Sequence, residues 1–318
     1  MTAGELGQHS SPAAALRGAS KVPQVTVFFW ITKLLTTGMG EATSDYLAHR
    51  FGPVIAVALG GTGLVVSLAL QFRVRRYLAW VYWTAVVMVA VFGTMAADGL
   101  HIELHIPYVV STAFFAIVLA VIFVTWYASE MTLSIHSIYT RRREAFYWAT
   151  VMATFALGTA AGDLTANTMH LGFLSSGILF AAVIAVPAVG YWRFGLNSIV
   201  AFWFAYIVTR PLGASFADWM GVPRPLSGLN MGRGPVSLGL TIVITGFVAY
   251  LAATRIDVDE AAAPASAQRA RHRRQAPQPA RTRGAAVRVP VTDTAWRDRS
   301  LGDPQSRVTR PEERPEEL

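Results

Sequence analysis

The stretch WITKLLTTGMGEATSD, residues 30–45, decides the fold because it recurs three more times along the chain. The other copies are WTAVVMVAVFGTMAAD at 83–98, WATVMATFALGTAAGD at 148–163 and WFAYIVTRPLGASFAD at 203–218. In every copy a glycine follows the tryptophan by ten positions and an aspartate follows it by fifteen. The shared residues are Trp30, Trp83, Trp148 and Trp203, then Gly40, Gly93, Gly158 and Gly213, then Asp45, Asp98, Asp163 and Asp218. Three uncommon residues at fixed spacing in four places predict four tandem copies of one structural unit.

Each copy is followed by a second apolar run, so the unit holds a motif helix and a return helix. A helix of about 20 apolar residues is long enough to cross the ~30 Å hydrocarbon core of a bilayer. The chain is 53% hydrophobic and only 14% charged, and its mean hydropathy of +0.41 excludes an ordinary soluble domain. The sequence therefore predicts an all-α integral membrane protein of eight transmembrane helices, at about 23–45, 53–72, 78–98, 107–128, 145–166, 172–192, 197–219 and 234–253.

Charge in the loops predicts the orientation of these helices. The polar stretch 129–144 separates two halves of two units, and the repeats fall at about 23–74, 75–128, 145–194 and 197–254. Lys and Arg number ten on one side of the membrane and three on the other, so both termini are predicted to be cytoplasmic, in the inner membrane. Two spans per unit make all four motif helices parallel, related by a pseudo-symmetry axis along the membrane normal.

The two ends of the chain are predicted to be disordered and cytoplasmic, over residues 1–22 and 255–318. Of 27 basic residues, 13 lie from Arg255 onward in an Arg/Pro-rich tail, so the net charge of +8 does not predict a nucleic-acid partner. A solvated tail is the first interpretation, and contact with anionic lipid or with a partner is the alternative. The absence of cysteine excludes disulfides and thiolate metal sites.

The four motif aspartates are the main candidate site, because they are predicted to lie at one depth near the outer ends of parallel helices. A carboxylate near hydrocarbon is costly unless it is paired, neutralised or facing water, so it is a functional-site hypothesis by default. One turn before the aspartates stand Glu41, Thr94, Thr159 and Ala214, which add an oxygen in three of four repeats. The alternative is that each aspartate only caps a helix end at the outer interface.

Histidines near the aspartates add a metal hypothesis. Carboxylate and imidazole together are typical of sites for first-row divalent cations, and the candidate ligands are Asp45, Asp98, Asp163, His49, His101 and His170. Such an ion is expected as a transported substrate, and no resident cofactor is predicted. The alternative, equally compatible with the sequence, is that these histidines are loop residues at the membrane interface.

The fourth repeat departs from the others by carrying Arg210-Pro211 inside its span. The proline is expected to free the carbonyl of Ile207. Arg210 is predicted to pair with Asp218 or with an acid of a neighbouring repeat, leaving three free carboxylates. The motif glycines predict close helix packing, and the motif tryptophans, with Trp80, Trp126 and Trp192, predict an aromatic belt at the cytoplasmic side.

The pattern of four two-helix units with one Trp-x9-Gly-x4-Asp motif each, over about residues 24–254, resembles a bacterial family of membrane-anchored proteins. That family consists of four tandem copies of a repeat of unknown function. The resemblance implies the architecture and names no activity.

Three functional hypotheses follow from these residues. The first is a secondary transporter of a small cation, for example a divalent metal, coupled to protons through the ring of aspartates. The second is a transporter of a small organic cation or solute, and the third is a non-transporting scaffold or sensor that acts through the basic tail. The partners expected are the lipid bilayer, a small cation and protons. An enzyme is not predicted, because Gly-x-Ser-x-Gly and His-Glu-x-x-His are absent and four equivalent aspartates do not resemble a catalytic dyad.

Overall fold

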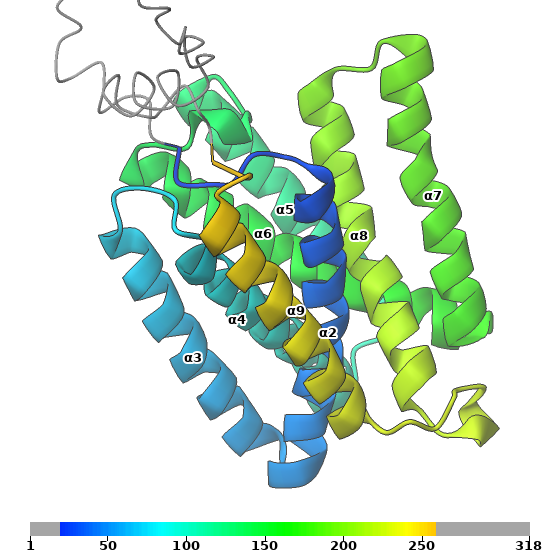
Figure 1. The fold of residues 1–318 in the computed structure, drawn as a ribbon. Helices are drawn as coiled ribbons and strands as arrows, with labels where there is room; N and C mark the ends of the chain where they lie inside the picture. The colour runs from blue at the N-terminus through cyan, green and yellow to red at the C-terminus, as the bar shows by residue number, and fades with distance from the viewer. Residues whose placement is uncertain (1–19, 259–318) are drawn as a thin grey trace, which may run out of the picture. The chain divides into compact units, whose positions relative to one another are not determined.

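The computed structural model describes residues 20–258, and within this range eight long helices follow one another without a strand (Figure 1). The motif helices are α2 (Val27–Phe51), α4 (Ala79–Asp98), α6 (Arg141–Asp163) and α8 (Ser198–Gly221). The return helices are α3 (Pro53–Arg73), α5 (Tyr108–Glu130), α7 (Gly172–Phe194) and α9 (Arg233–Thr254). Short helical turns are η1 (Gly99–Glu103), η2 (Ile135–Ser137), η3 (Leu164–Thr168) and η4 (Arg224–Leu226). Each long helix lies on one of the eight segments predicted from the sequence.

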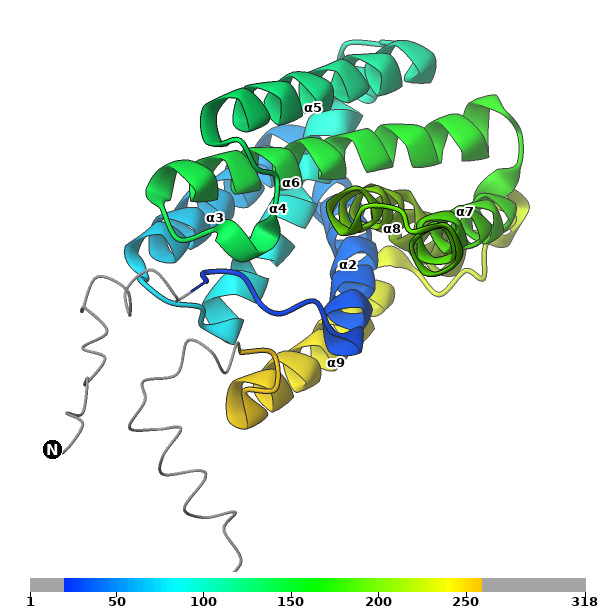
Figure 2. The ribbon, with the colours of Figure 1, turned by 90° about the horizontal axis from the view of Figure 1, so that it is seen from above.

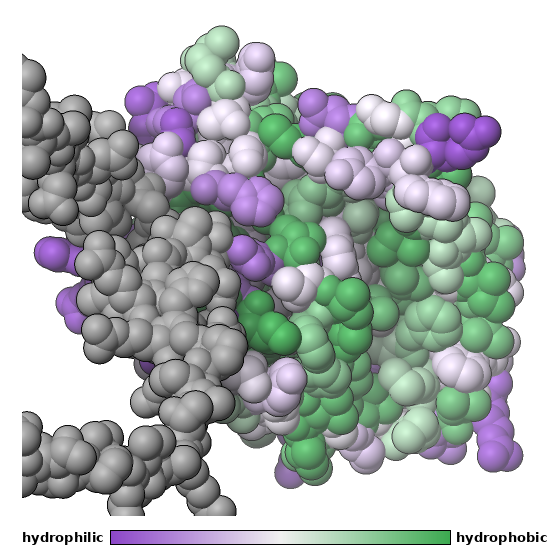
Figure 3. Space-filling view, turned by 45° about the horizontal axis from the view of Figure 1, so that its top comes forward, coloured by the Kyte–Doolittle hydropathy of each residue, from purple (hydrophilic) through white to green (hydrophobic). Residues whose placement is uncertain are grey.

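Six of these helices are long and apolar enough to cross a membrane, namely α3, α4, α5, α7, α8 and α9. The other two, α2 and α6, carry more polar side chains, including Lys33 and Glu41 on α2, and these are buried inside the protein. Figure 3 shows one face with hydrophobic side chains across its middle and hydrophilic ones at its upper edge and at its lower right edge. A multi-pass membrane protein is the structure that this surface and these helices indicate.

The motif helices form a closed ring in which α2 packs on α4, α4 on α6, α6 on α8 and α8 back on α2. Each return helix packs mainly on the motif helix of the next unit, so α3 covers α4, α5 covers α6 and α7 covers α8 (Figure 2). The last return helix, α9, covers α2 and so completes the outer layer. The end of each motif helix near its tryptophan is called the Trp end here, and the other end is called the Asp end.

One close contact recurs at all four interfaces of the ring. The motif glycine of each helix packs against the residue that stands seven positions after the tryptophan of the next motif helix. A Cβ atom on the glycine would lie closer than 3.0 Å to that side chain in every case, for Gly40 on Ala90, Gly93 on Phe155, Gly158 on Arg210 and Gly213 on Thr37. Only glycine fits such an approach, so the repeated glycine sets the spacing of the ring.

The predicted aromatic belt is wrong for three of the motif tryptophans. Trp83, Trp148 and Trp203 are buried and pack with Phe29 and three tyrosines inside the Trp end of the ring. Trp126 is also fully buried, whereas Trp80 and Trp192 are exposed. The physical reason is that four helices leave a wide interior, which large aromatic side chains fill.

The structure differs from the sequence-based predictions at Pro211 and at the two terminal segments. Helix α8 continues through Pro211, so the proline does not break it. Residues 20–22 and 255–258, which the sequence assigned to the terminal segments, pack on the helices: Lys21 pairs with Glu144 at 2.5 Å, and Asp257 is buried. The rest of the predicted disordered ends, 1–19 and 259–318, lies outside the described residues.

Candidate functional site

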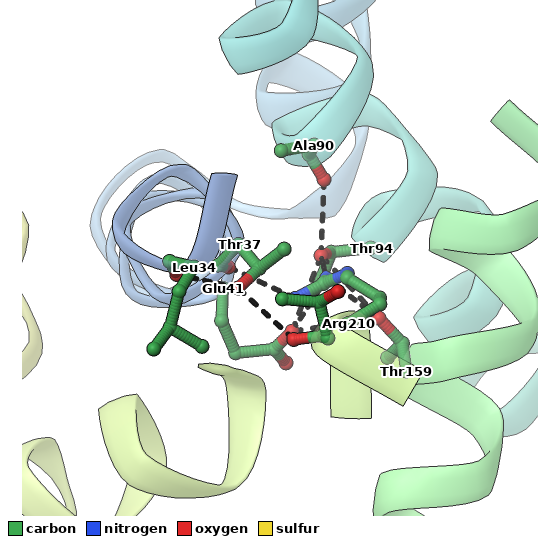
Figure 4. A network of polar contacts seen from close by, with 8 residues as sticks. Leu34, Thr37, Glu41, Ala90, Thr94, Thr159 and Arg210 are labelled. Atoms are coloured by element: carbon green, nitrogen blue, oxygen red, sulfur yellow. Dashed lines mark hydrogen bonds and ion pairs between the residues drawn. The ribbon is translucent and has the colours of Figure 1, made fainter. Parts of the chain in front are cut away.

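An ion pair lies inside the ring, centred on the fully buried Arg210 of α8 (Figure 4). Its Nη2 donates to the Glu41 carboxylate at 2.7 Å, to the Thr159 hydroxyl at 2.7 Å and to the Thr94 hydroxyl. Its Nη1 donates to the Thr37 carbonyl oxygen at 2.9 Å. The guanidinium is therefore bound by groups from all three other motif helices.

The repeat explains why these groups meet. Glu41, Thr94 and Thr159 each stand eleven positions after the motif tryptophan, so equivalent positions of three units converge on one point. The fourth unit has Ala214 there and supplies Arg210 from one turn earlier. The stem of Arg210 crosses Gly158, where a Cβ atom would collide with it. The motif glycine of the third unit is thus also what admits the arginine.

Threonine hydroxyls support both members of the buried pair. The hydroxyls of Thr94 and Thr159 accept from Arg210 and lie 3.2 and 3.4 Å from the Glu41 carboxylate, to which they donate. A buried ion pair repays the loss of hydration only when further hydrogen bonds satisfy both ions. This site supplies them at Nη1 and Nη2 of Arg210, whereas the buried Nε has no partner in residues 20–258. Removing either partner would leave a charge in an apolar interior without compensation.

A third ionisable side chain, Lys33 of α2, lies deeper toward the Trp end. It is 1% exposed, and its Nζ has no hydrogen-bond partner among the described residues. The Nζ lies 3.8 Å from the ring centroid of Phe155 and 4.1 Å from that of Tyr206, so cation–π contact is its main polar interaction. Lys33 is not among the site residues predicted from the sequence. The available signal was that the other units carry Val86, Val151 and Tyr206 at the same position.

The four motif aspartates lie at the Asp end, and each is partly exposed. All four are near enough to Glu41 to interact with it electrostatically. Asp45 forms an ion pair with Arg233 at the start of α9, with an Nε to Oδ2 distance of 2.5 Å. Within residues 20–258, Asp98, Asp163 and Asp218 have no ion pair at all. Arg210 thus pairs with Glu41 of the first unit and not with Asp218.

The three histidines predicted as metal ligands have different surroundings. His49 is exposed and bonds the carbonyl of Asp45 at 2.8 Å, His101 packs on the ring of Tyr108, and His170 is exposed. Over the described part of the chain, no three His, Asp or Glu side chains are grouped so that they would hold a metal ion. A divalent metal as the transported ion stays a prediction.

The comparisons with known proteins agree with the repeat. The chain matches the family described as Repeat of Unknown Function (DUF347) over residues 28–77, 81–132, 146–196 and 201–257, one match for each predicted unit. No curated protein and no solved structure matches the chain. The four-unit family proposed from the sequence is confirmed, and the description of that family names no activity.

Proposed function

Since the chain belongs to the Repeat of Unknown Function family, we propose a function from the site alone: secondary transport of a small cation across the inner membrane, coupled to protons through the repeat acids. The observation that carries this proposal is the Glu41–Arg210 pair, buried inside the ring near four aspartates that are partly exposed at one end. Ionisable groups inside a membrane protein are expensive and usually mark an ion or proton path.

The proposal includes a topology. All eight long helices cross the bilayer, with the ring axis along the membrane normal and the Trp ends toward the cytoplasm. The polar side chains of α2 and α6 do not argue against this, because both helices are largely covered by their neighbours. The acidic Asp end then faces outward.

The charges support a two-step path for a cation. Asp98, Asp163 and Asp218, which lack an ion pair in residues 20–258, raise the local concentration of cations at the Asp end. A cation or a proton that reaches Glu41 competes with Arg210 for the same carboxylate. Because Glu41 and Arg210 join α2 to α8, this competition biases the contact between the two helices and provides a switch between two states.

Ion flux in proteoliposomes tests the proposal. The intact protein is compared with Asp45→Asn, Asp98→Asn and Asp163→Asn, using Na⁺, K⁺, Mn²⁺ and Zn²⁺ in separate assays with a trapped pH dye. We expect flux of at least one cation to fall about tenfold in the Asp98 and Asp163 variants, since a loss of 1.4 kcal/mol in binding is tenfold. The matched control is Glu130→Gln, which removes a carboxylate that pairs with Arg143 at the Trp end. Unchanged flux in all three aspartate variants would end the proposal.

One observation favours a small apolar organic cation as a second candidate substrate. A groove of about 750 Å³ lies between α2, α7 and α8 and is lined by apolar and aromatic side chains, including Trp30, Tyr191 and Phe202. It reaches Thr209, the neighbour of Arg210. Uptake of tetraphenylphosphonium in the same proteoliposomes would favour this class, and flux of inorganic cations without such uptake would exclude it.

A further inference from the structure

All the buried tyrosines in residues 20–258 lie together at the Trp end of the ring. They are Tyr206 of α8, Tyr147 of α6, Tyr82 of α4 and Tyr77, which precedes α4. None is more than 9% exposed. These four residues are called the tyrosine column here.

The column is connected from one member to the next. The hydroxyls of Tyr82 and Tyr147 are hydrogen-bonded at 2.5 Å. Within residues 20–258 the hydroxyl of Tyr206 has no hydrogen-bond partner. The rings of Tyr206 and Tyr147 both pack on Trp203, with centroids 5.5 and 6.2 Å from that of Trp203, and the rings of Tyr77 and Tyr82 meet edge to face with centroids 5.6 Å apart. The hydroxyl of Tyr77 donates to the carboxylate of Asp257.

The two ends of the column are ionisable groups. At one end, the ring of Tyr206 lies 4.1 Å from Nζ of Lys33, the side chain whose charge also interacts with Arg210. At the other end, Asp257 follows α9 and is 2% exposed, with Oδ1 unpartnered. Burial raises the pKa of the Asp257 carboxyl, although the hydrogen bond from Tyr77 opposes this shift. Asp257 is thereby able to hold a proton at a higher pH than an ordinary aspartate.

We propose that the tyrosine column is a proton path from Lys33, beside the Glu41–Arg210 pair, to Asp257 at the Trp end. This inference rests on the proposed transport function and names the inner half of its proton route. A hydroxyl is both a donor and an acceptor, so each tyrosine takes one proton and passes on its own without becoming charged. The Lys33 ammonium gives up one proton and becomes a neutral amine, and the Asp257 carboxylate takes one and becomes a neutral acid. No hydrogen bond joins Lys33 to the Tyr206 hydroxyl, Tyr206 to Tyr147 or Tyr82 to Tyr77 in residues 20–258. These three steps therefore need a side-chain movement, so they are the slow ones.

The repeat itself argues that packing does not require these hydroxyls. Tyr82 and Tyr147 directly precede their motif tryptophans, and the other two units have Phe29 and Phe202 at that position. Likewise, the position of Lys33 and Tyr206 is occupied by Val86 and Val151 in the middle units. An aromatic ring or an apolar side chain therefore fills each place equally well, and the polar atoms are left for another role.

The charged and titratable groups near the path come from every helix packed on it. Glu41 and Lys33 face the ring interior from α2, Arg210 faces it from α8, and the four tyrosines complete the interior toward the Trp end. A further charged pair lies outside the column: Lys21 bonds Glu144, which also accepts from Gln71. Each variant used to test the path changes one residue and leaves the other groups in place.

The experiment removes single hydroxyls and keeps the rings. Tyr82→Phe and Tyr147→Phe are compared with the intact protein in proteoliposomes that carry a trapped pH dye, with Na⁺ and Mn²⁺ as the driving cations. We expect proton movement to fall about tenfold in both variants while the protein stays folded, as 1.4 kcal/mol on a barrier is tenfold. The control is Tyr250→Phe, on α9 and half exposed, with its ring against Phe28. A second variant, Asp257→Asn, is expected to abolish the dependence of the rate on pH at the Trp side.

The outcomes separate this inference from the transport proposal. If the intact protein moves protons and both Phe variants move them equally fast, the path is overturned and transport stands. If the intact protein moves a cation without protons, the path is again overturned and only uncoupled transport remains. If neither ion moves, both proposals fail. Loss of proton movement in the Phe variants alone, with the Tyr250 control unaffected, supports the path.

Discussion

The interface between α8 and α2 and the one between α4 and α6 lie across the ring from each other and share a backbone contact. At the first, Gly213 packs on Thr37, and at the second, Gly93 packs on Phe155. Their interiors differ. The α8–α2 interface holds Arg210 and Glu41 and lies beside Lys33, whereas the α4–α6 interface has apolar side chains at the positions equivalent to Lys33 and Arg210. Two neighbouring motif helices thus make the same glycine contact whether or not their interface contains charged side chains.

The α4–α6 interface indicates that two motif helices pack in this way without a charged pair between them. Replacing a buried ion pair with apolar residues of similar volume is often neutral or stabilising, so stability does not explain the pair. The first and fourth units contain Lys33, Glu41 and Arg210, and the two middle units have no ionisable side chain at the equivalent positions. We therefore regard α8–α2 as the working interface and α4–α6 as the structural one.

The largest effect is expected from Glu41→Gln, which leaves the Arg210 guanidinium buried without a counter-ion. Removing one partner of a buried pair costs about 3–5 kcal/mol, so the free energy of unfolding in detergent should fall by that order. The double variant Glu41→Gln with Arg210→Met should recover most of the loss, because both charges are gone. Thermal and denaturant unfolding of the purified protein measure both.

Glu130→Gln is the matched control for this test, since Glu130 pairs with Arg142 and Arg143, which are 64% and 16% exposed, whereas Arg210 is fully buried. It should cost less than Glu41→Gln. If the two single variants lose the same stability, or if the double variant is worse than Glu41→Gln, the contrast between the interfaces is wrong.

The next largest effect is expected from alanine at the motif glycines, and it should be the same at both interfaces. A Cβ atom at Gly93 or Gly213 would overlap the facing side chain, and overpacking typically costs about 1–3 kcal/mol. Unfolding measurements on Gly93→Ala and Gly213→Ala check this. Gly239→Ala on α9 is the control, because no atom lies within 4 Å of its added methyl group. A large loss at only one interface would show that the shared backbone contact is not equivalent.

The glycines also show how far the sequence alone reached. The spacing Trp-x9-Gly-x4-Asp predicted the eight helices and the importance of Gly40, Gly93, Gly158 and Gly213, because both follow from a periodic pattern. It also identified Glu41, Thr94 and Thr159 as one group, since they share a position in the repeat. It did not identify Glu41 as the partner of Arg210, which depends on how far the arginine stem extends past Gly158.

Residues outside the repeated motif were harder to predict. Lys33 and Tyr206 were overlooked because only an alignment of the four units at that position reveals them as departures. The burial of Trp83 and Trp148 was missed because tryptophan near a helix end usually indicates an interface, and only the ring shows that these helix ends surround an interior. Asp257 was placed in the tail because composition alone does not reveal its contact with Tyr77, 180 residues away in sequence.

A smaller effect is expected from removing one hydroxyl of the ion-pair site. Thr94→Val or Thr159→Val deletes one acceptor for Arg210, but the guanidinium keeps its carboxylate, so the loss should be about 1 kcal/mol for each. Thr154→Val is the control, because the hydroxyl of Thr154 is buried and bonds only the Val151 carbonyl of its own helix. Unfolding in detergent and cation flux are measured on the same preparations. If Thr154→Val costs as much as the other two, the threonines at the site act through packing and not through Arg210.

The smallest effect is expected at the rim of the working interface, from Arg233→Gln. This change breaks the ion pair with Asp45. The side chain of Arg233 is 30% exposed and that of Asp45 is 18% exposed. Partly exposed pairs contribute about 0–1 kcal/mol and are screened by salt, so the difference from the intact protein should shrink as NaCl rises. The freed Asp45 carboxylate joins the three other aspartates, so cation binding at the Asp end should strengthen even as stability falls slightly. Equilibrium binding of Na⁺ and Mn²⁺ at low and high ionic strength measures this. Weaker binding in Arg233→Gln would mean that the aspartates cap helix ends and do not act on the cation together.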